Sequence, residues 1–482
     1  MSPLDMDIDL MGAQPALFKL YTQLAFMFPL SESEEGQQPS HHQVTSTMTA
    51  GLAELAANFP WVAGQVVNTN PDTEAAPHYK IRPYEPVPQL VVRDYTGDAE
   101  MPSFDLMHQK GFPMSVLGEG VWAPCPTLAA AAMGFDPKKA SGASSDEPAP
   151  VMLVQINYVR GGLVLCVNMQ HNVCDMMGQA AVLGWLSQAC RSEHFTENEL
   201  GIGNMTRVGI VPLIEDEGWA PGPELQNQLF PPLPPTVDKE VDNTVERKSP
   251  EPPSKCAWTY FDFSAESLES LKGLATASLP QDFTSFISTD DALSAFIFLS
   301  VLRTRQSRLR PDASVTFARA VDARRYLDIH PDYPGVLQNM AYTSYPQESL
   351  FSTPLGHIAA KMRQAVDPLA SDVAYRTRSL ATFLSQSPDN ATKTSFTATL
   401  DMSVDIALSS WTKVPAYEWD FGLRLGSPVA VRRPGFVPVE SLMYLMPRSR
   451  EGSVAVAMCL REEDLQHLLR DEEWKRFARY IG

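Results

Sequence analysis

The chain has 482 residues, of which 44% are hydrophobic and 20% charged, and its formal net charge is -19. This length exceeds what one hydrophobic core organises, so two or three domains are expected. The negative charge argues against nucleic acid as a partner, because binding a polyanion depends on clustered Lys and Arg. A local basic patch would still allow a small anionic cosubstrate.

The cysteines and the N-terminus indicate where the protein works. Six cysteines are scattered without pairing or metal-type spacing, which predicts a reducing compartment. Asp5, Asp7 and Asp9 precede the first apolar stretch, so the positive region of a secretory signal is missing. No uninterrupted apolar run reaches bilayer length. We therefore expect a cytoplasmic protein that has no membrane partner.

A β-hairpin followed by a helix is the clearest local pattern of the first half. Two stretches, residues 151–158 and 163–169, alternate apolar and polar around an Arg-Gly-Gly turn. Residues 176–190 then carry apolar side chains at helical spacing. Asp175 is expected to cap this helix, where a carboxylate meets free backbone N–H groups. His171 would stand just before it, at the end of the strand.

His171 in this strand–turn–helix setting is a candidate general base, because a base must be held on a rigid element. The alternative is a hydrogen-bonded core histidine. His171, Cys174 and Asp175 do not form a convincing zinc set, since further ligands at usual spacing are missing, so no metal site is expected. The chain also lacks the Gly-x-Ser-x-Gly elbow of serine hydrolases.

Proline density marks a boundary at residues 230–255, which read as an exposed extended linker. This predicts an N-terminal domain over 1–229 and a C-terminal domain over 256–482. Polar stretches at 136–150 and 385–393 predict surface loops. The Gly-Ile-Gly sequence at 201–203 lacks the third glycine of a dinucleotide loop and is interpreted as a turn.

The second half alternates strand-like and helical patterns, which favours an α/β architecture with mixed sheets. Ser264 is expected to cap a helix that runs to residue 274, and Ser288 or Thr289 one that covers 292–302. A last amphipathic helix is predicted over 461–480. The expected strands cover residues 257–263, 315–321, 401–409, 437–446 and 453–460.

Four arginines cluster near the end of the helix predicted over 292–302: Arg303, Arg305, Arg308 and Arg310. Cations there offset the negative end of the helix dipole, so side chains facing solvent are the favoured interpretation. A phosphate-binding patch is the alternative. Residues 420–426, Asp-Phe-Gly-Leu-Arg-Leu-Gly, read by themselves as a glycine-punctuated structural corner.

Read together, two motifs resemble the signatures of the BAHD acyl-CoA-dependent acyltransferases, His171-x-x-x-Asp175 first and Asp420-Phe421-Gly422 second. Finer matches along nearly the whole chain are similar to the fungal trichothecene 3-O-acetyltransferase branch. They occur in order at residues 60–66, 288–296, 320–324, 333–335, 337–340, 409–411, 431–434 and 440–444. The chain departs from the plant pattern at Met176-Met177, which precede Gly178, and at Arg424, which stands where relatives tend to have glycine.

The resemblance implies two chloramphenicol-acetyltransferase-like domains with mixed β-sheets flanked by helices and a solvent channel between them. His171 would act as general base on the acceptor hydroxyl. Asp175, the second residue of the catalytic motif, would turn away from the channel and pair with Arg324. The oxyanion of the intermediate would be stabilised by the indole N–H of Trp411 or the hydroxyl of Ser409.

The resemblance further implies acetyl-CoA, or another acyl-CoA, as cosubstrate and no permanently bound cofactor. Asp420 and Gly422 would shape a distant loop of the second domain that supports CoA binding. The alcohol would be a small polycyclic molecule, and the enzyme a monomer. The CoA-binding residues would be Ser288, Thr289, Asp290 and Ser410.

The expected function is transfer of acetyl from acetyl-CoA to the 3-hydroxyl of a trichothecene, through a ternary complex. A different alcohol of fungal secondary metabolism is an alternative acceptor. A peptide-condensing domain of the same superfold would carry a His-His pair, whereas Gln170 precedes His171. A non-catalytic binding protein would tolerate loss of His171, yet both motifs are kept.

Overall fold

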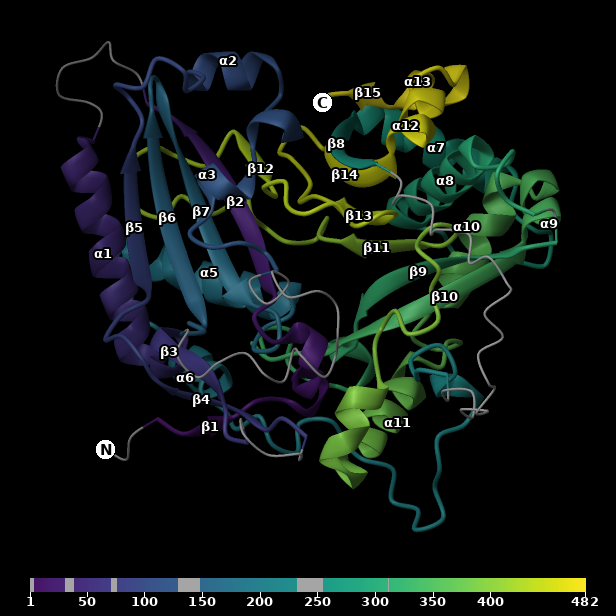
Figure 1. The fold of residues 1–482 in the computed structure, drawn as a ribbon, viewed down its shortest axis with the longest axis horizontal. Coiled ribbons are helices and arrows are strands. Elements are labelled where there is room, and N and C mark those ends of the chain that lie inside the picture. The colour runs from purple at the N-terminus through teal and green to yellow at the C-terminus, as the bar shows by residue number, and fades with distance from the viewer. Residues whose placement is uncertain (1–3, 31–38, 71–75, 129–147, 232–254, 311) are drawn as a thin grey trace, which may run out of the picture.

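The computed structural model describes residues 4–30, 39–70, 76–128, 148–231, 255–310 and 312–482. Two large β-sheets, one of five strands and one of seven, dominate this part of the chain. Helices pack on both sheets, as Figure 1 shows. The expected α/β class with mixed sheets is confirmed. Most of the predicted linker at 230–255 and of the predicted loop at 136–150 lies outside the described residues.

The five-stranded sheet is built mainly by the first half. Its strands in spatial order are β12 (Ala430–Arg432), β2 (Tyr21–Pro29), β7 (Gly162–Gln170), β6 (Met152–Val159) and β5 (Gln89–Asp94). β6 and β7 are the predicted hairpin. Both are buried throughout, because α1 (His41–Asn58) and α5 (Met176–Cys190) pack on one face while α2 (Phe104–Gln109) and α3 (Glu119–Trp122) cover the other.

Smaller elements complete the first half. A three-stranded sheet consists of β1 (Met6–Asp7), β4 (Tyr79–Pro83) and β3 (Gly64–Asn68), and α6 covers Glu197–Gly203.

The short 3-10 helices of the described chain are η1 (Leu10–Ala13), η2 (Pro15–Leu17), η3 (Pro60–Ala63), η4 (Met114–Val116), η6 (Pro223–Leu225), η7 (Arg324–Tyr326) and η8 (Pro388–Lys393).

The seven-stranded sheet belongs to the second half. Its strands in spatial order are β10 (Gln338–Pro346), β9 (Ser314–Asp322), β11 (Ile406–Ser410), β13 (Leu442–Leu445), β14 (Val454–Arg461), β8 (Cys256–Phe263) and β15 (Arg479–Tyr480). The accompanying helices are α7 (Ala265–Ala277), α8 (Thr289–Thr304), α9 (Gln347–Ser352), α10 (Leu355–Gln364), α11 (Val373–Gln386), α12 (Glu462–Leu468) and α13 (Glu472–Phe477). Ser264 and Ser288 cap α7 and α8 as predicted.

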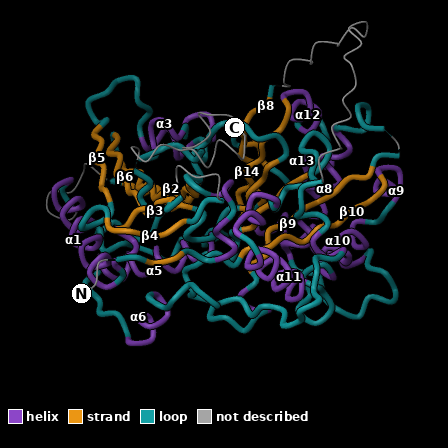
Figure 2. Tube along the Cα trace, turned by 60° about the horizontal axis from the view of Figure 1, so that its bottom comes forward, coloured by secondary structure: helices purple, strands orange, loops and turns teal. Residues whose placement is uncertain are grey.

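The two halves exchange segments. Figure 2 shows their strands as two groups, but β12, from the second half, pairs with β2 and sets Val431 opposite Phe26. Trp419 and Phe421 pack in the core of the first half. In return, Met11 of η1 packs in a cluster formed mostly by second-half residues. The division by chain order into 1–229 and 256–482 stays a prediction, and these crossings tie the halves together.

Several predicted elements differ from the structure. The prediction of a single helix over 461–480 is wrong. Asp471 accepts hydrogen bonds from the N–H groups of Glu473 and Trp474 and so starts α13 as a separate helix, which β15 follows. The predicted turn at 201–203 is the end of α6, which a capping box at Thr196 initiates. The strand predicted over 437–446 is confined to β13, and the loop at 385–393 contains η8.

The prediction that the arginine cluster faces solvent is wrong for part of the cluster. Arg305 has 0% exposure and its Nε donates to Asp464 at 2.9 Å, because α12 packs beside the end of α8. Arg308 reaches the same carboxylate at 2.9 Å. Arg310 does face solvent. The cluster therefore joins two helices of the second half and is not a free cationic patch.

Among the helices of the described residues, none is both long and apolar enough to cross a bilayer.

Candidate active site

The turn that carries His171 connects β7 to α5, as the sequence predicts. The main-chain N–H of His171 donates to the carbonyl of Leu20 at 2.7 Å, which fastens the end of β7 to the chain entering β2. Asp175 is the N-cap of α5, and its Oδ1 accepts the N–H of Gly178 at 2.8 Å. The base candidate is thus held between a strand end and a capped helix start.

Asp175 and Arg324 form the ion pair that the resemblance implies. Arg324 donates Nη1 to Oδ2 and Nη2 to Oδ1, each at 2.9 Å, and both side chains are buried. Its remaining donors reach the carbonyls of Tyr333 and Gly335, at 3.0 and 2.7 Å, and the carboxylate of Asp322 at 2.7 Å. All five guanidinium hydrogens are therefore bonded, so the arginine is fixed in position.

The second-half segment around Arg324 lies directly against the turn. The N–H of Leu337 donates to Oδ2 of Asp175 at 2.7 Å. A Cβ added to Gly178 would stand 2.2 Å from the carbonyl oxygen of Pro334, so only glycine permits this approach at the first turn of α5. The position of His171 consequently depends on contacts between the two halves.

A second buried carboxylate, which sequence reasoning missed, holds the same turn. Asp9 is 3% exposed and accepts Nη1 of Arg207 at 3.0 Å. The same Nη1 donates to the carbonyl of Val173 inside the turn at 2.6 Å. Tyr333 donates its hydroxyl to Asp9, and burial, followed by the nearby carboxylate, raises the pKa of this phenol. In the sequence Asp9 is only one of several N-terminal acids, so no spacing signal could identify it.

The surroundings of His171 favour the neutral form of its imidazole. Burial lowers its pKa below the ordinary value of 6.5, and the positive charge of Arg433 acts in the same direction, whereas Asp175 raises it. Nδ1 is buried and bonds no other residue of the described chain, and a hydrogen bond of the imidazole with its own backbone also raises the pKa. Nε2 is then the ring nitrogen that can meet a substrate, in the neutral form that accepts a proton.

Cys174, a thiol on the same turn as His171, is buried in a setting that disfavours its thiolate. Its exposed fraction is 1%, and burial raises the pKa of its thiol to about 12, an effect that Arg207 only partly opposes. At neutral pH the thiolate is therefore scarce. The side chain packs in the main core of the first half.

We predict that Cys174→Ala keeps most of the transferase activity, because Cys174 fills space and carries no acyl group. Mass spectrometry after mixing the enzyme with acetyl-CoA alone should detect no acetylated protein on the timescale of turnover. Acetylation of Cys174 that disappears when alcohol is added would contradict this prediction.

The two candidate oxyanion donors are coupled to each other. Trp411 donates its indole N–H to Oγ of Ser409 at 2.9 Å. The indole hydrogen is thereby occupied, while the Ser409 hydroxyl keeps its own hydrogen to donate. Ser409 is paired with Tyr444 of β13, and the rings of Tyr444 and Trp411 lie 4.8 Å apart. Ser409 is thus the better-placed donor of the two.

The proposed CoA residues meet where α8 begins and β11 ends. The hydroxyl of Ser288 is engaged in a capping box with Asp291, and Thr289 is the first residue of α8. Oδ1 of Asp290 is buried without a partner, and burial raises the pKa of this carboxyl, whereas the Ser410 hydroxyl lowers it. Asp290 and Ser410 are therefore neighbours in space, as the resemblance implies. Their contact with CoA stays a proposal.

The second motif packs on the first half, at the far end of α5. The N–H of Gly422 donates to Asp420 at 2.9 Å, and Asp420 also lies 3.6 Å from Arg191. Gly422 has φ +61°, and a Cβ there would lie 2.5 Å from the carbonyl of Cys190, so both conformation and space favour glycine. Arg424 adopts φ +60°, where glycine would be less strained. About 22 Å of helix separates this corner from Asp175.

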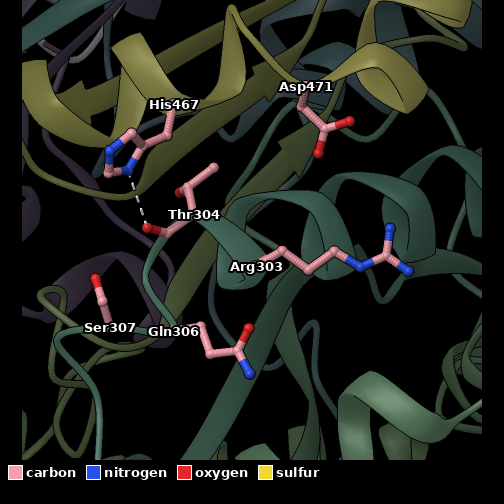
Figure 3. A pocket seen from close by; sticks show the side chains of 6 residues that line it. All are labelled: Arg303, Thr304, Gln306, Ser307, His467 and Asp471. Carbon is pink, nitrogen blue, oxygen red and sulfur yellow. Dashed lines mark hydrogen bonds between the residues drawn. The ribbon is translucent and has the colours of Figure 1, made fainter.

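A surface hollow of about 460 Å³ lies away from these residues, between the ends of α8 and α12. Figure 3 shows that His467, Asp471 and Arg303 surround it, with His467 bonded to the carbonyl of Thr304. None of the predicted site residues lines it. In the part of the chain that is described, no cluster of His, Cys, Asp and Glu is arranged to hold a metal ion.

Comparison with known proteins agrees with this arrangement. A profile described as the trichothecene 3-O-acetyltransferase-like N-terminal domain matches residues 20–190, and one described as the transferase family matches 129–474. The chain belongs to the BAHD transferase family, in the trichothecene 3-O-acetyltransferase branch. It is therefore an acyl-CoA-dependent O-acetyltransferase with acyl-CoA as its cosubstrate, which confirms the expected enzyme class.

Individual relatives match over nearly their full length. An O-acetyltransferase of Cryptosporiopsis sp. (strain 8999) is 41% identical, covering 99% of this chain and 98% of its own. The trichothecene 3-O-acetyltransferase of Fusarium sporotrichioides is 40% identical, covering 99% and 97%. The crystal structure of the F. graminearum counterpart with coenzyme A and deoxynivalenol superposes with a TM-score of 0.87 at 38% identity, covering 99% of this chain and 100% of that one.

Proposed function

We propose that this O-acetyltransferase acetylates the 3-hydroxyl of a trichothecene, with His171 as general base. One observation supports the role of His171 as base most directly. Burial favours its neutral form, and residues from both halves of the protein hold the turn that carries it. The acceptor is suggested by relatives of this branch that are named trichothecene 3-O-acetyltransferases and match over nearly the whole chain.

In the proposed reaction, Nε2 of His171 takes the proton of the acceptor hydroxyl while the oxygen attacks the thioester carbonyl carbon. A carbon–oxygen bond forms, and the π pair moves onto the carbonyl oxygen. When the intermediate collapses, the carbon–sulfur bond breaks and the proton passes from Nε2 to the CoA sulfur. The products are the acetyl ester and free CoA, and His171 is neutral again.

The other site residues assist this direct transfer. Asp175 acts through structure: bonded to Arg324 and to the first turn of α5, it keeps the His171 turn in place and is not a second acid. The Ser409 hydroxyl, oriented by the Trp411 indole, donates to the carbonyl oxygen as charge develops on it. Holding both substrates beside His171 supplies the advantage of proximity.

A thiol-release assay with acetyl-CoA tests the acceptor. Deoxynivalenol, which the F. graminearum counterpart binds, should release CoA thiol in proportion to a product whose mass is increased by one acetyl group. Fragmentation should locate that group on the 3-hydroxyl. Deoxynivalenol blocked at the 3-hydroxyl is the matched control and should release none. Equal rates with both compounds would contradict 3-O-acetylation.

A second candidate acceptor is another polycyclic alcohol of fungal secondary metabolism. It is favoured by the Cryptosporiopsis relative, which is as similar as the Fusarium one and is named simply as an O-acetyltransferase. The same assay with a panel of polycyclic alcohols distinguishes the two candidates. A kcat/KM at least tenfold higher for a non-trichothecene alcohol would select the second.

The lowered pKa of His171 predicts the pH dependence of the reaction. Only the neutral imidazole accepts a proton, so kcat/KM should be constant at neutral pH and fall as the pH drops through the pKa of His171. Because burial lowers that pKa, the midpoint of the fall should lie below 6.5. A kcat/KM profile from pH 5 to 9 measures it. A midpoint clearly above 6.5 would contradict a buried neutral base.

We also propose that the enzyme is a monomer in the cytoplasm. All six cysteines are free, which supports a reducing compartment. Light scattering coupled to size-exclusion chromatography should give the mass of one chain, and a fluorescent fusion in the native host should label the cytoplasm evenly. A mass of two chains or labelling of an organelle would contradict the respective proposal.

A further inference from the structure

Arg433, which follows β12, is a buried cation without an anionic partner. It is 3% exposed, yet within the described chain its Nε and Nη1 have no hydrogen-bond partner, and Nη2 has only a long bond of 3.4 Å to the hydroxyl of Thr127. Two aromatic rings hold its guanidinium, Phe436 at 4.1 Å and Tyr444 at 4.9 Å. Its backbone is fixed too, because the hydroxyl of Tyr260 bonds both its N–H and its carbonyl.

The other buried arginines that the structure describes have carboxylate or main-chain carbonyl partners. Arg207, Arg305, Arg319, Arg324 and Arg363 each pair with a buried carboxylate. Arg432 donates Nη1 and Nη2 to two main-chain carbonyls, each at 3.0 Å, and only its Nε lacks a partner in the described chain, as does Nη2 of Arg207. Burying a guanidinium with open donors is costly, and contacts with aromatic faces offset only part of that cost. Arg433 differs from the other buried arginines in combining two open donors with the lack of any carboxylate or carbonyl partner in the described chain, which makes it the candidate for holding a negatively charged ligand.

Arg433 lies beside the reaction centre. Thr127, its hydroxyl contact, bonds through its carbonyl to the N–H of Tyr21 at 2.7 Å. Tyr21 is the β2 partner of Gln170, the residue before His171. The charge of Arg433 is accordingly close enough to lower the pKa of His171.

On its other side Arg433 approaches the oxyanion candidate. Its guanidinium rests on the ring of Tyr444, whose paired neighbour on β11 is Ser409. The Trp411 ring packs on Tyr444 as well. Arg433 and Ser409 thus flank one tyrosine on the face of the second sheet that packs toward the first half.

We propose that Arg433 binds the negatively charged oxygen that forms on the thioester carbonyl during acetyl transfer. This inference rests on the proposed direct transfer at His171. When the acceptor oxygen attacks and its proton moves to His171, the carbonyl π pair becomes an oxyanion, and the open donors of Arg433 complement that charge together with Ser409. As the carbon–sulfur bond breaks, the carbonyl re-forms and Arg433 is released.

The test compares Arg433→Met, which removes the charge, with Arg433→Lys, which keeps it. We expect Arg433→Met to lower kcat about 10²–10³-fold, the loss typical of a missing oxyanion donor, while KM for acetyl-CoA and alcohol changes little. Arg433→Lys should recover part of kcat. In Arg433→Met the low-pH limb of kcat/KM should move to higher pH, because His171 loses a positive neighbour.

Arg432→Met is the matched control, since Arg432 is the adjacent buried arginine and both its terminal nitrogens donate to main-chain carbonyls. It should reduce stability without the kcat loss or the pH shift. Unchanged kcat in Arg433→Met, a loss confined to KM, or an equal kcat loss in Arg432→Met would overturn the proposal. Activity retained by His171→Ala would instead overturn the proposed function, so the two failures are distinguishable.

Discussion

His171→Ala should lower turnover by about two to four orders of magnitude, the range that a general base contributes. The imidazole is the one basic group on the clamped turn between β7 and α5, and its neutral form is favoured by burial. Because Nδ1 bonds no other residue of the described chain, removal of the side chain should leave the fold and the affinity for acetyl-CoA nearly unchanged. Steady-state kinetics and calorimetric titration with acetyl-CoA measure the two quantities.

His467→Ala is a suitable control for this substitution. His467 is an exposed histidine of α12, remote from the turn, and its ring makes a single long hydrogen bond of 3.4 Å to the carbonyl of Thr304. Its replacement should leave kcat unchanged. If His171→Ala retained a tenth of wild-type turnover, His171 would not be the base.

Asp175→Asn should destabilise the protein by about 3–5 kcal/mol, because it removes the buried carboxylate of Arg324 and leaves only the partly exposed Asp322 to balance the buried charge. The carboxylate accepts both terminal nitrogens of Arg324 and the N–H groups of Gly178 and Leu337, so its loss disturbs the helix start and the contact between the halves together. Urea unfolding followed by circular dichroism measures the change, and activity should fall with it.

Asp322→Asn is the matched control on the same arginine. Asp322 also bonds Arg324, at 2.7 Å, but its side chain is 35% exposed, so a loss within about 1 kcal/mol is expected. A fully stable but inactive Asp175→Asn protein would give Asp175 a direct chemical role. Arg324→Met combined with Asp175→Leu should be more stable than either single variant, since no buried charge is left unpaired.

These contacts connect the folding of the two halves to catalysis. The turn that bears His171 is built by β7 and α5, but the groups that hold it come from η7, from the segment at 333–337 and from the N-terminal Asp9. The candidate oxyanion donor Ser409 and its paired neighbour Tyr444 belong to the second sheet, which is built by the second half alone. The site is therefore completed only when the two halves are docked.

Local features were predictable from the sequence, because they depend on interactions between near neighbours. The alternation around the Arg-Gly-Gly turn defines the β6–β7 hairpin, and apolar spacing defines α5. Capping by Asp175 and Ser288 involves N–H groups three residues away. The family resemblance added the pairing of Asp175 with Arg324, which no local pattern contains, since 149 residues separate them.

Only the tertiary structure decided the remaining features, which depend on distant segments. Asp9 meets Arg207 across 198 residues, and the two lie in no motif. The sequence places Arg305 at a solvent-facing helix end. In the structure α12 packs beside it and supplies Asp464 as its partner. The helix predicted over 461–480 breaks because Asp471 caps a new helix and Arg479–Tyr480 pairs with β8. Arg433 is ordinary in the sequence, and its open donors emerge only where β12 crosses to the first sheet.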